Sequence, residues 1–177
     1  RDIAIKFNHD YKVDFFPVTE PVIGGTASRV MSLRDGTKKM SKSDPSDLSR
    51  INMGDDADTI FLKFKKAKTD AGALPSEIPG LKNRPEAENL ITIYSALSNQ
   101  SIESTLKEVG GKQFSEFKPI LAERAVELLS PISTEMNRLM QNSEEIDIIL
   151  SKGADRARKI AGPILQKTYE IIGMLQP

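Results

Sequence analysis

The strongest chemical signal in this sequence is a Lys- and Ser-rich stretch at residues 38–47, which reads KKMSKSDPSD. It carries three lysines and three serines but few apolar side chains, so burial cannot be its purpose. Lysine ammonium groups, hydroxyls and backbone N–H groups are the partners that phosphate oxygens accept. The run DPSD at 44–47 predicts a helix start, whose N-terminus would add partial positive charge. The stretch has the parts of a polyphosphate-binding loop, although a solvated surface loop has a similar composition.

Such a loop suits a reaction in which a carboxylate attacks the α-phosphate of ATP and pyrophosphate leaves. Cations and hydrogen-bond donors placed where negative charge develops lower the barrier without a strong base. Lys39 and Lys42 are spaced so that a curled loop can aim both at a triphosphate. Ser41 and Ser43 can donate to phosphate oxygens or hold the shape of the loop. Gly36 precedes the loop and predicts a hinge for a lid that closes on ATP.

Other catalytic chemistries find little support in the composition. The chain has 177 residues, no cysteine and one histidine, so neither a disulfide framework nor a metal site is predicted. The pair Gly24-Gly25 is followed by Thr-Ala-Ser rather than Gly-Lys-Ser, which excludes a P-loop there. His9 is expected to be a surface residue at a helix end. Helix capping is the simplest role for the aspartates near helix starts, namely Asp44, Asp47, Asp55, Asp56 and Asp58.

The elements before the Lys- and Ser-rich stretch are predicted from short patterns. Apolar spacing indicates the end of an amphipathic helix over 1–8, followed by extended pieces at 13–18 and 21–23. Residues 30–33 alternate between apolar and polar and predict a strand that delivers the loop from its carboxyl end. Ligands of open α/β sheets bind at that end of the strands.

After residue 48 the sequence predicts helices only. Apolar periodicity and capping residues place helix starts near residues 55, 85, 101, 114, 131, 143 and 154. The Gly- and Pro-rich segment 71–85 predicts a loop. Pro131 is expected to end one helix and begin another, and Pro163 to kink or break the last one.

Charge and hydropathy bound the class of protein. Lysine plus arginine and aspartate plus glutamate both number 25, and this balance neither proves nor excludes nucleic-acid binding because a local patch decides it. No apolar run approaches the about 18 residues of a membrane span, and no signal peptide is seen. A soluble cytoplasmic protein without membrane partners is therefore expected. The chain begins with Arg1 rather than methionine, and we expect a piece of a longer protein.

Residues 39–43, KMSKS, are identical to the KMSKS element of class I aminoacyl-tRNA synthetases. The flanking segments 29–38 and 44–47 closely resemble bacterial-type tryptophanyl-tRNA synthetases. Segments 55–57 and 66–70 also resemble that branch more than the sister tyrosyl-tRNA synthetases, which can carry the same loop. The resemblance covers nearly the whole chain and weakens beyond about Gly111.

The resemblance implies a mainly α fold in two parts. Residues 1–48 would be the C-terminal portion of a Rossmann-type α/β catalytic domain with the KMSKS loop, and residues 49–177 an α-helical tRNA anticodon-binding domain. The implied activity is ATP-dependent conversion of L-tryptophan to tryptophanyl-adenylate and its transfer to tRNA(Trp). Lys39 and Lys42 would be catalytic, and Mg²⁺ would arrive with the ATP. The residues expected to line the ATP site are Val30, beside the adenine, and Lys39, Met40, Ser41, Lys42 and Ser43.

The family also implies partners and a missing half. A homodimer that binds tRNA(Trp) is expected, while the family's HIGH-like element and amino-acid pocket are absent, so this chain alone is expected to be inactive. Candidate RNA contacts are the basic residues Lys63, Lys65, Lys66, Lys68 and Arg84, and Lys152, Arg156, Arg158 and Lys159. The alternatives are a non-catalytic helical module that binds tRNA or a partner, a tyrosyl-tRNA synthetase, and a different nucleotidyl-transferring enzyme.

Overall fold

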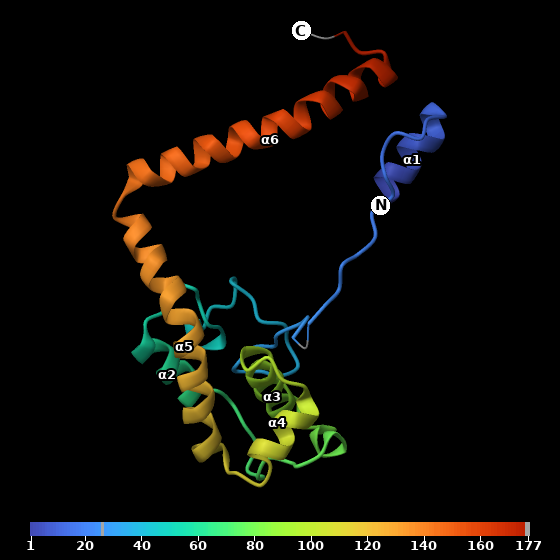
Figure 1. The fold of residues 1–177 in the computed structure, drawn as a ribbon. Helices are drawn as coiled ribbons and strands as arrows, with labels where there is room; N and C mark the ends of the chain where they lie inside the picture. The colour runs from blue at the N-terminus through green and yellow to red at the C-terminus, as the bar shows by residue number, and fades with distance from the viewer. Residues whose placement is uncertain (26, 176–177) are drawn as a thin grey trace. The chain divides into compact units, whose positions relative to one another are not determined.

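A computed structural model describes residues 1–25 and 27–175 of the chain (Figure 1). Two compact units are formed, one by residues 24–138 and the other by residues 1–23 together with the chain after residue 138. The α-helices are α1 (Asp2–Tyr11), α2 (Ala57–Lys65), α3 (Pro85–Leu97), α4 (Ile102–Val109), α5 (Phe114–Met140) and α6 (Ser143–Ile172). Two short 3₁₀ turns are η1 (Asp47–Ser49) and η2 (Ile78–Leu81).

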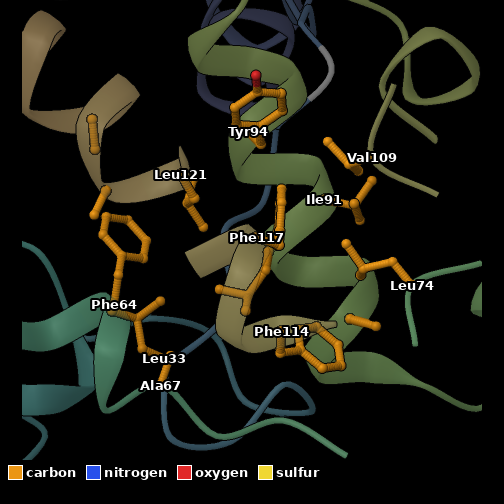
Figure 2. Packing of buried hydrophobic residues seen from close by; sticks show 14 of the residues in the cluster. Leu33, Phe64, Ala67, Leu74, Ile91, Tyr94, Val109, Phe114, Phe117 and Leu121 are labelled. Carbon is orange, nitrogen blue, oxygen red and sulfur yellow. The ribbon is translucent and has the colours of Figure 1, made fainter. Parts of the chain in front are cut away.

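The core of the unit formed by residues 24–138 contains apolar side chains from α2, α3, α4 and the first half of α5 (Figure 2). Phe117 of α5 is fully buried, and its ring lies edge-on to Tyr94 of α3 at a centroid distance of 5.6 Å. Leu33, which stands just before the Lys- and Ser-rich stretch, is buried in the same cluster. The core therefore directly holds the segment that leads into the candidate site.

Local capping signals explain where several helices begin. The side chain of Asp56 accepts a hydrogen bond from the backbone N–H of Thr59 at 2.8 Å, which caps α2 as expected. Ser101 accepts from the N–H of Ser104 at 3.2 Å and caps α4. Pro85 occupies the first turn of α3, where its missing N–H leaves no intrahelical bond unmade.

The prolines do not break the helices where the sequence predicted breaks. Helix α5 continues through Pro131, and α6 continues through Pro163. A proline removes one backbone donor, but the carbonyl freed by Pro131 belongs to Glu127, which is exposed and can bind water instead. The hydroxyl of Ser133 also donates to the neighbouring carbonyl of Ser130 at 3.1 Å. The separate helices expected from residues 143 and 154 are likewise one helix, since a glycine at 153 weakens a helix without ending it.

The predicted strand over 30–33 is wrong in extent. Within the described residues, β pairing there is limited to one isolated antiparallel bridge between Met31 and Lys39. The helix start expected at 44–47 is also reduced to the 3₁₀ turn η1, which has three residues. The mainly α class of the fold is confirmed.

In the other unit, α1 and the segment that follows it form an aromatic cluster. The rings of Phe7 and Phe16 lie 4.8 Å apart in an edge-on arrangement. The side chain of Asn8 accepts from the N–H groups of Phe15 and Phe16 and donates to the carbonyl of Phe16. His9 is exposed at the helix end, as expected. Among the described residues, none of the helices has both the length and the apolar content needed to cross a membrane.

Candidate functional site

The KMSKS loop (residues 39–43) leaves the core through a short hairpin over residues 30–40. The bridge between Met31 and Lys39 is flanked by two backbone hydrogen bonds of 2.8 and 3.0 Å. The second of these joins the N–H of Met40 to the carbonyl of Val30, the residue expected beside the adenine. Val30 is half-buried. The hairpin therefore brings the predicted adenine contact next to the first residues of the phosphate loop.

Asp35 organises the turn of this hairpin. Its carboxylate accepts from the backbone N–H of Thr37 at 3.1 Å and from the Thr37 hydroxyl at 2.6 Å. The ammonium group of Lys38 lies 3.3 Å from the same carboxylate. The hydrogen bonds from Thr37, with the charge of Lys38, hold the pKa of Asp35 below its ordinary value. Lys38 is thereby tied to the turn.

The loop itself presents its polar side chains to solvent. Lys39, Ser41, Lys42 and Ser43 are exposed, whereas Met40 is half-buried and packs against the core. The hydroxyls of Ser41 and Ser43 lie 2.9 Å apart, and the N–H of Ser43 points to the Ser41 hydroxyl. Within the described part of the chain, Lys39 and Lys42 make no ion pair that would hold their ammonium groups away from an incoming anion. The structure brings all the predicted phosphate contacts together on one exposed turn.

A buried lysine anchors the carboxyl end of the Lys- and Ser-rich stretch. Lys63 of α2 has a side chain only 1% exposed, and its ammonium group lies 2.7 Å from Asp47 and 2.6 Å from Asp55. Asn52 donates from its side chain to Asp47 and from its backbone to Asp55. Arg50 adds an ion pair to Asp47 at 3.0 Å. The hydrogen bond from Lys63, followed by that from Asn52, lowers the pKa of Asp47.

The contacts of Lys63 show that two sequence-based expectations are wrong. Its burial contradicts the predicted role as an RNA contact, and its two partners, Asp47 and Asp55, anchor a lysine rather than cap a helix. The sequence did contain a signal for this position. Lys63 lies three residues after Ile60 and four before Ala67, which places it on the buried face of α2.

Gly36 is a close-packing residue rather than a free hinge. It is buried, and a Cβ built on it would lie 2.5 to 2.7 Å from backbone atoms of Pro85 and Glu86 at the start of α3. Its φ is not positive in the structure, so backbone freedom is not what the position demands. Absence of a side chain lets the hairpin approach the first turn of α3.

We therefore expect Gly36→Ala to destabilise the unit formed by residues 24–138 by about 1–3 kcal/mol, because backbone atoms must move to admit the methyl group. The urea midpoint of the chain measures this effect. Gly54→Ala is the matched control, since its Cβ would meet only the flexible end of Met136 at 3.2 Å. A Gly36→Ala midpoint equal to that of Gly54→Ala would contradict the close-packing role.

Two residues of the first basic group are engaged in structural ion pairs. Arg84 forms a bidentate pair with Asp70 at 2.6 and 2.9 Å, and its guanidinium lies 5.9 Å from the ring centre of Phe114. This pairing lowers the pKa of Asp70. Lys68 pairs with Glu86 at 2.8 Å. These contacts join the segment after α2 to the start of α3, so these two side chains support the fold around the hairpin.

The remaining basic candidates are exposed. Lys65 and Lys66 lie at the end of α2 with their side chains in solvent. The second group, on α6, is exposed as well, and within it Arg158 pairs with Asp155 at 3.0 Å. Lys65 and Lys66 are thus the members of the first group that remain available for RNA in the described structure.

Comparisons with known proteins agree with this arrangement. The family model for class I tRNA synthetases of the W and Y type matches residues 1–130. The tryptophan–tRNA ligase of Rhizobium meliloti is 59% identical over 99% of this chain and 55% of its own length. That of Agrobacterium fabrum is 54% identical with the same coverage. The chain spans about half the length of the curated relatives it matches.

Solved structures show the same likeness in three dimensions. The tryptophanyl-tRNA synthetase of Mycoplasma pneumoniae superimposes with a TM-score of 0.77 at 26% identity, covering 99% of this chain and 54% of that one. The enzyme from Campylobacter jejuni, solved in complex with ADP and tryptophan, gives a TM-score of 0.64 at 27% identity, covering 98% and 52%. With the family model matching most of its length, this chain belongs to the class I tRNA synthetases of the W and Y type.

Proposed function

We propose that this chain is the C-terminal half of a tryptophan–tRNA ligase and supplies its ATP-phosphate loop and its tRNA-binding helices. Residues 1–48 complete the catalytic domain, and residues 49–177 form the anticodon-binding part. The observation that carries the proposal is the exposed KMSKS loop, whose two lysines face solvent between anchored ends. The tryptophan–tRNA ligases that match nearly the whole chain support the choice of tryptophan over tyrosine.

The chemistry follows from the charges on the loop. The carboxylate of tryptophan attacks the α-phosphorus of ATP, the bond to the bridging oxygen of the β-phosphate breaks, and pyrophosphate leaves with the bonding electrons. Lys39 and Lys42 act as mobile cations beside the leaving group, and Ser41 and Ser43 donate hydrogen bonds or keep the turn in shape. Mg²⁺ travels with the nucleotide, since the loop offers ammonium groups and hydroxyls but no carboxylate ligand.

The direct test is tryptophan-dependent exchange of pyrophosphate into ATP, measured on the complete protein that contains this chain. The proposal predicts exchange with tryptophan and none with tyrosine. Because the family's HIGH-like element and amino-acid pocket are not in this sequence, the 177-residue chain alone is expected to give no exchange. A complete protein that binds tRNA but never exchanges pyrophosphate would instead be a non-catalytic helical module.

The same proposal makes the complete protein a homodimer that acts in the cytoplasm on tRNA(Trp). Such an assembly is expected to bind RNA through charge as well as shape. Replacing Lys66 by alanine should lower the slope of log affinity for tRNA(Trp) against log salt by about one, because one phosphate contact is lost. Binding measured over a range of KCl concentrations gives this slope. Lys107→Ala, which removes an exposed lysine on α4, is the control, and equal slopes for the two variants would discard Lys66 as a contact.

A further inference from the structure

Asn89 of α3 makes an unusual pair of contacts with the hairpin. Its side-chain oxygen accepts from the backbone N–H of Met31 at 2.9 Å, and its side-chain nitrogen donates to the carbonyl of the same residue, also at 2.9 Å. Asn89 is buried, and the two residues are 58 positions apart in the chain. The amide of one side chain thus binds both polar groups of one backbone residue, as a neighbouring β-strand would.

The hairpin needs this partner because of the geometry of its bridge. On one side, the backbone groups of Val30 and Ser32 pair with the arm that carries the KMSKS loop. The N–H and carbonyl of Met31 point the other way, where α3 stands in place of a strand. Unpaired buried backbone groups are costly, so an amide at this position satisfies both at once. Neither a carboxylate nor an aliphatic side chain can donate and accept in this way.

Packing between the hairpin and α3 is incomplete beside this contact. A cavity of about 230 Å³ lies beside the contact, lined in part by Met31, Asn89 and Gly36. Asparagine is also a poorer helix former than alanine, so its place inside α3 is explained by the hydrogen bonds rather than by the helix. The two hydrogen bonds from Asn89 therefore hold the hairpin at Met31, while the buried Leu33 and the close contact of Gly36 with α3 anchor the rest of it.

We propose that Asn89 is a positioning residue for nucleotide activation, which fixes the Val30–Met31 backbone and through it the register of the KMSKS loop. The inference rests on the proposed function for its catalytic consequence. Asn89 touches neither phosphate nor adenine in this scheme and acts by holding the strand on which both contacts depend. Loss of its side chain leaves Lys39 and Lys42 in the sequence but allows the hairpin, and with it the KMSKS loop, to shift.

The first test follows backbone hydrogen exchange in the chain carrying Asn89→Ala. The N–H groups of Met31 and Met40 should exchange at least about tenfold faster than in the wild type, while that of Gly110, at the end of α4, stays within twofold. Ser95→Ala is the matched control, since it removes another buried hydrogen bond of α3, that to Thr105 at 2.8 Å. Equal acceleration at all three amides, or none at Met40, would overturn the positioning role.

The second test measures pyrophosphate exchange in the complete protein. Asn89→Ala should lower kcat about tenfold or more while the KM for tryptophan stays within twofold, and Ser95→Ala should change neither. Asn89→Asp keeps the oxygen that accepts from the N–H of Met31 but loses the donor to its carbonyl. This variant is measured if the alanine variant does not fold, and its kcat should lie between that of the wild type and the value expected for Asn89→Ala. A kcat equal to that of Ser95→Ala would overturn the inference. If the wild-type protein shows no pyrophosphate exchange, the proposed function is refuted. The hydrogen-exchange experiment would still show whether Asn89 holds the hairpin.

Discussion

Replacing Lys42 by alanine is expected to lower the rate of tryptophan-dependent pyrophosphate exchange by about 10² to 10³. Lys42 lies at the exposed turn of the KMSKS loop and has no ion-pair partner among the described residues. Its ammonium group would be drawn to the pyrophosphate more strongly as negative charge grows there, so its loss raises the barrier more than it weakens ATP binding. The effect should therefore appear mainly in kcat, measured on the complete protein at saturating ATP.

The hairpin offers its own control for this prediction. Lys38 is also exposed and lies four residues earlier, but its ammonium group is held 3.3 Å from Asp35. Lys38→Ala should therefore change kcat less than about threefold, since an exposed ion pair contributes little. Equal losses for Lys38→Ala and Lys42→Ala would mean that general positive charge, rather than a placed ammonium group, accounts for the effect.

The second large effect concerns stability. Lys63→Met should destabilise the unit formed by residues 24–138 by about 3–5 kcal/mol, because it leaves the nearly buried Asp55 without its counterion. The same change removes the ion pair between Asp47 and α2, so the carboxyl end of the Lys- and Ser-rich stretch loses its anchor on that helix while Asp47 keeps Arg50 and Asn52 as partners. Urea unfolding of the chain, followed by circular dichroism, measures the loss.

Two further variants separate charge burial from other causes. Lys65→Met removes an exposed lysine from the same helix and should change stability by less than about 0.5 kcal/mol. Adding Asp55→Asn to Lys63→Met removes the unpaired charge and should recover part of the loss, since the amide oxygen can still accept from Asn52. If Lys63→Met alone is as stable as Lys65→Met, the buried pairs do not anchor the loop.

Features with a local cause were predictable from the sequence. Asp56 and Ser101 cap helices because each has a short polar side chain directly before an apolar periodic segment. The KMSKS loop was recognised because its polar composition argues against burial and its sequence is identical to an element of class I aminoacyl-tRNA synthetases. The exposure of Lys39 and Lys42 agrees with that prediction, while their contact with ATP stays a proposal.

Features that depend on distant partners were not predictable. Asn89 binds a residue 58 positions away, and no local pattern marks which backbone groups it satisfies. Gly36 looked like a hinge because the approach of Pro85 cannot be seen along the chain. The prediction at Pro131 failed for another reason, since the rule for prolines assumes that the freed carbonyl stays unsatisfied, whereas here it belongs to the exposed residue Glu127 and can bind water.

The proposed function depends above all on binding of the ATP phosphates by the KMSKS loop. A crystal structure of the complete protein with tryptophan and a non-hydrolysable ATP analogue tests it most directly. The ammonium groups of Lys39 and Lys42 are expected to lie about 3 Å from phosphate oxygens, with the hydrogen bonds between Asn89 and Met31 retained. A loop that points away from the triphosphate in every nucleotide-bound state would contradict it.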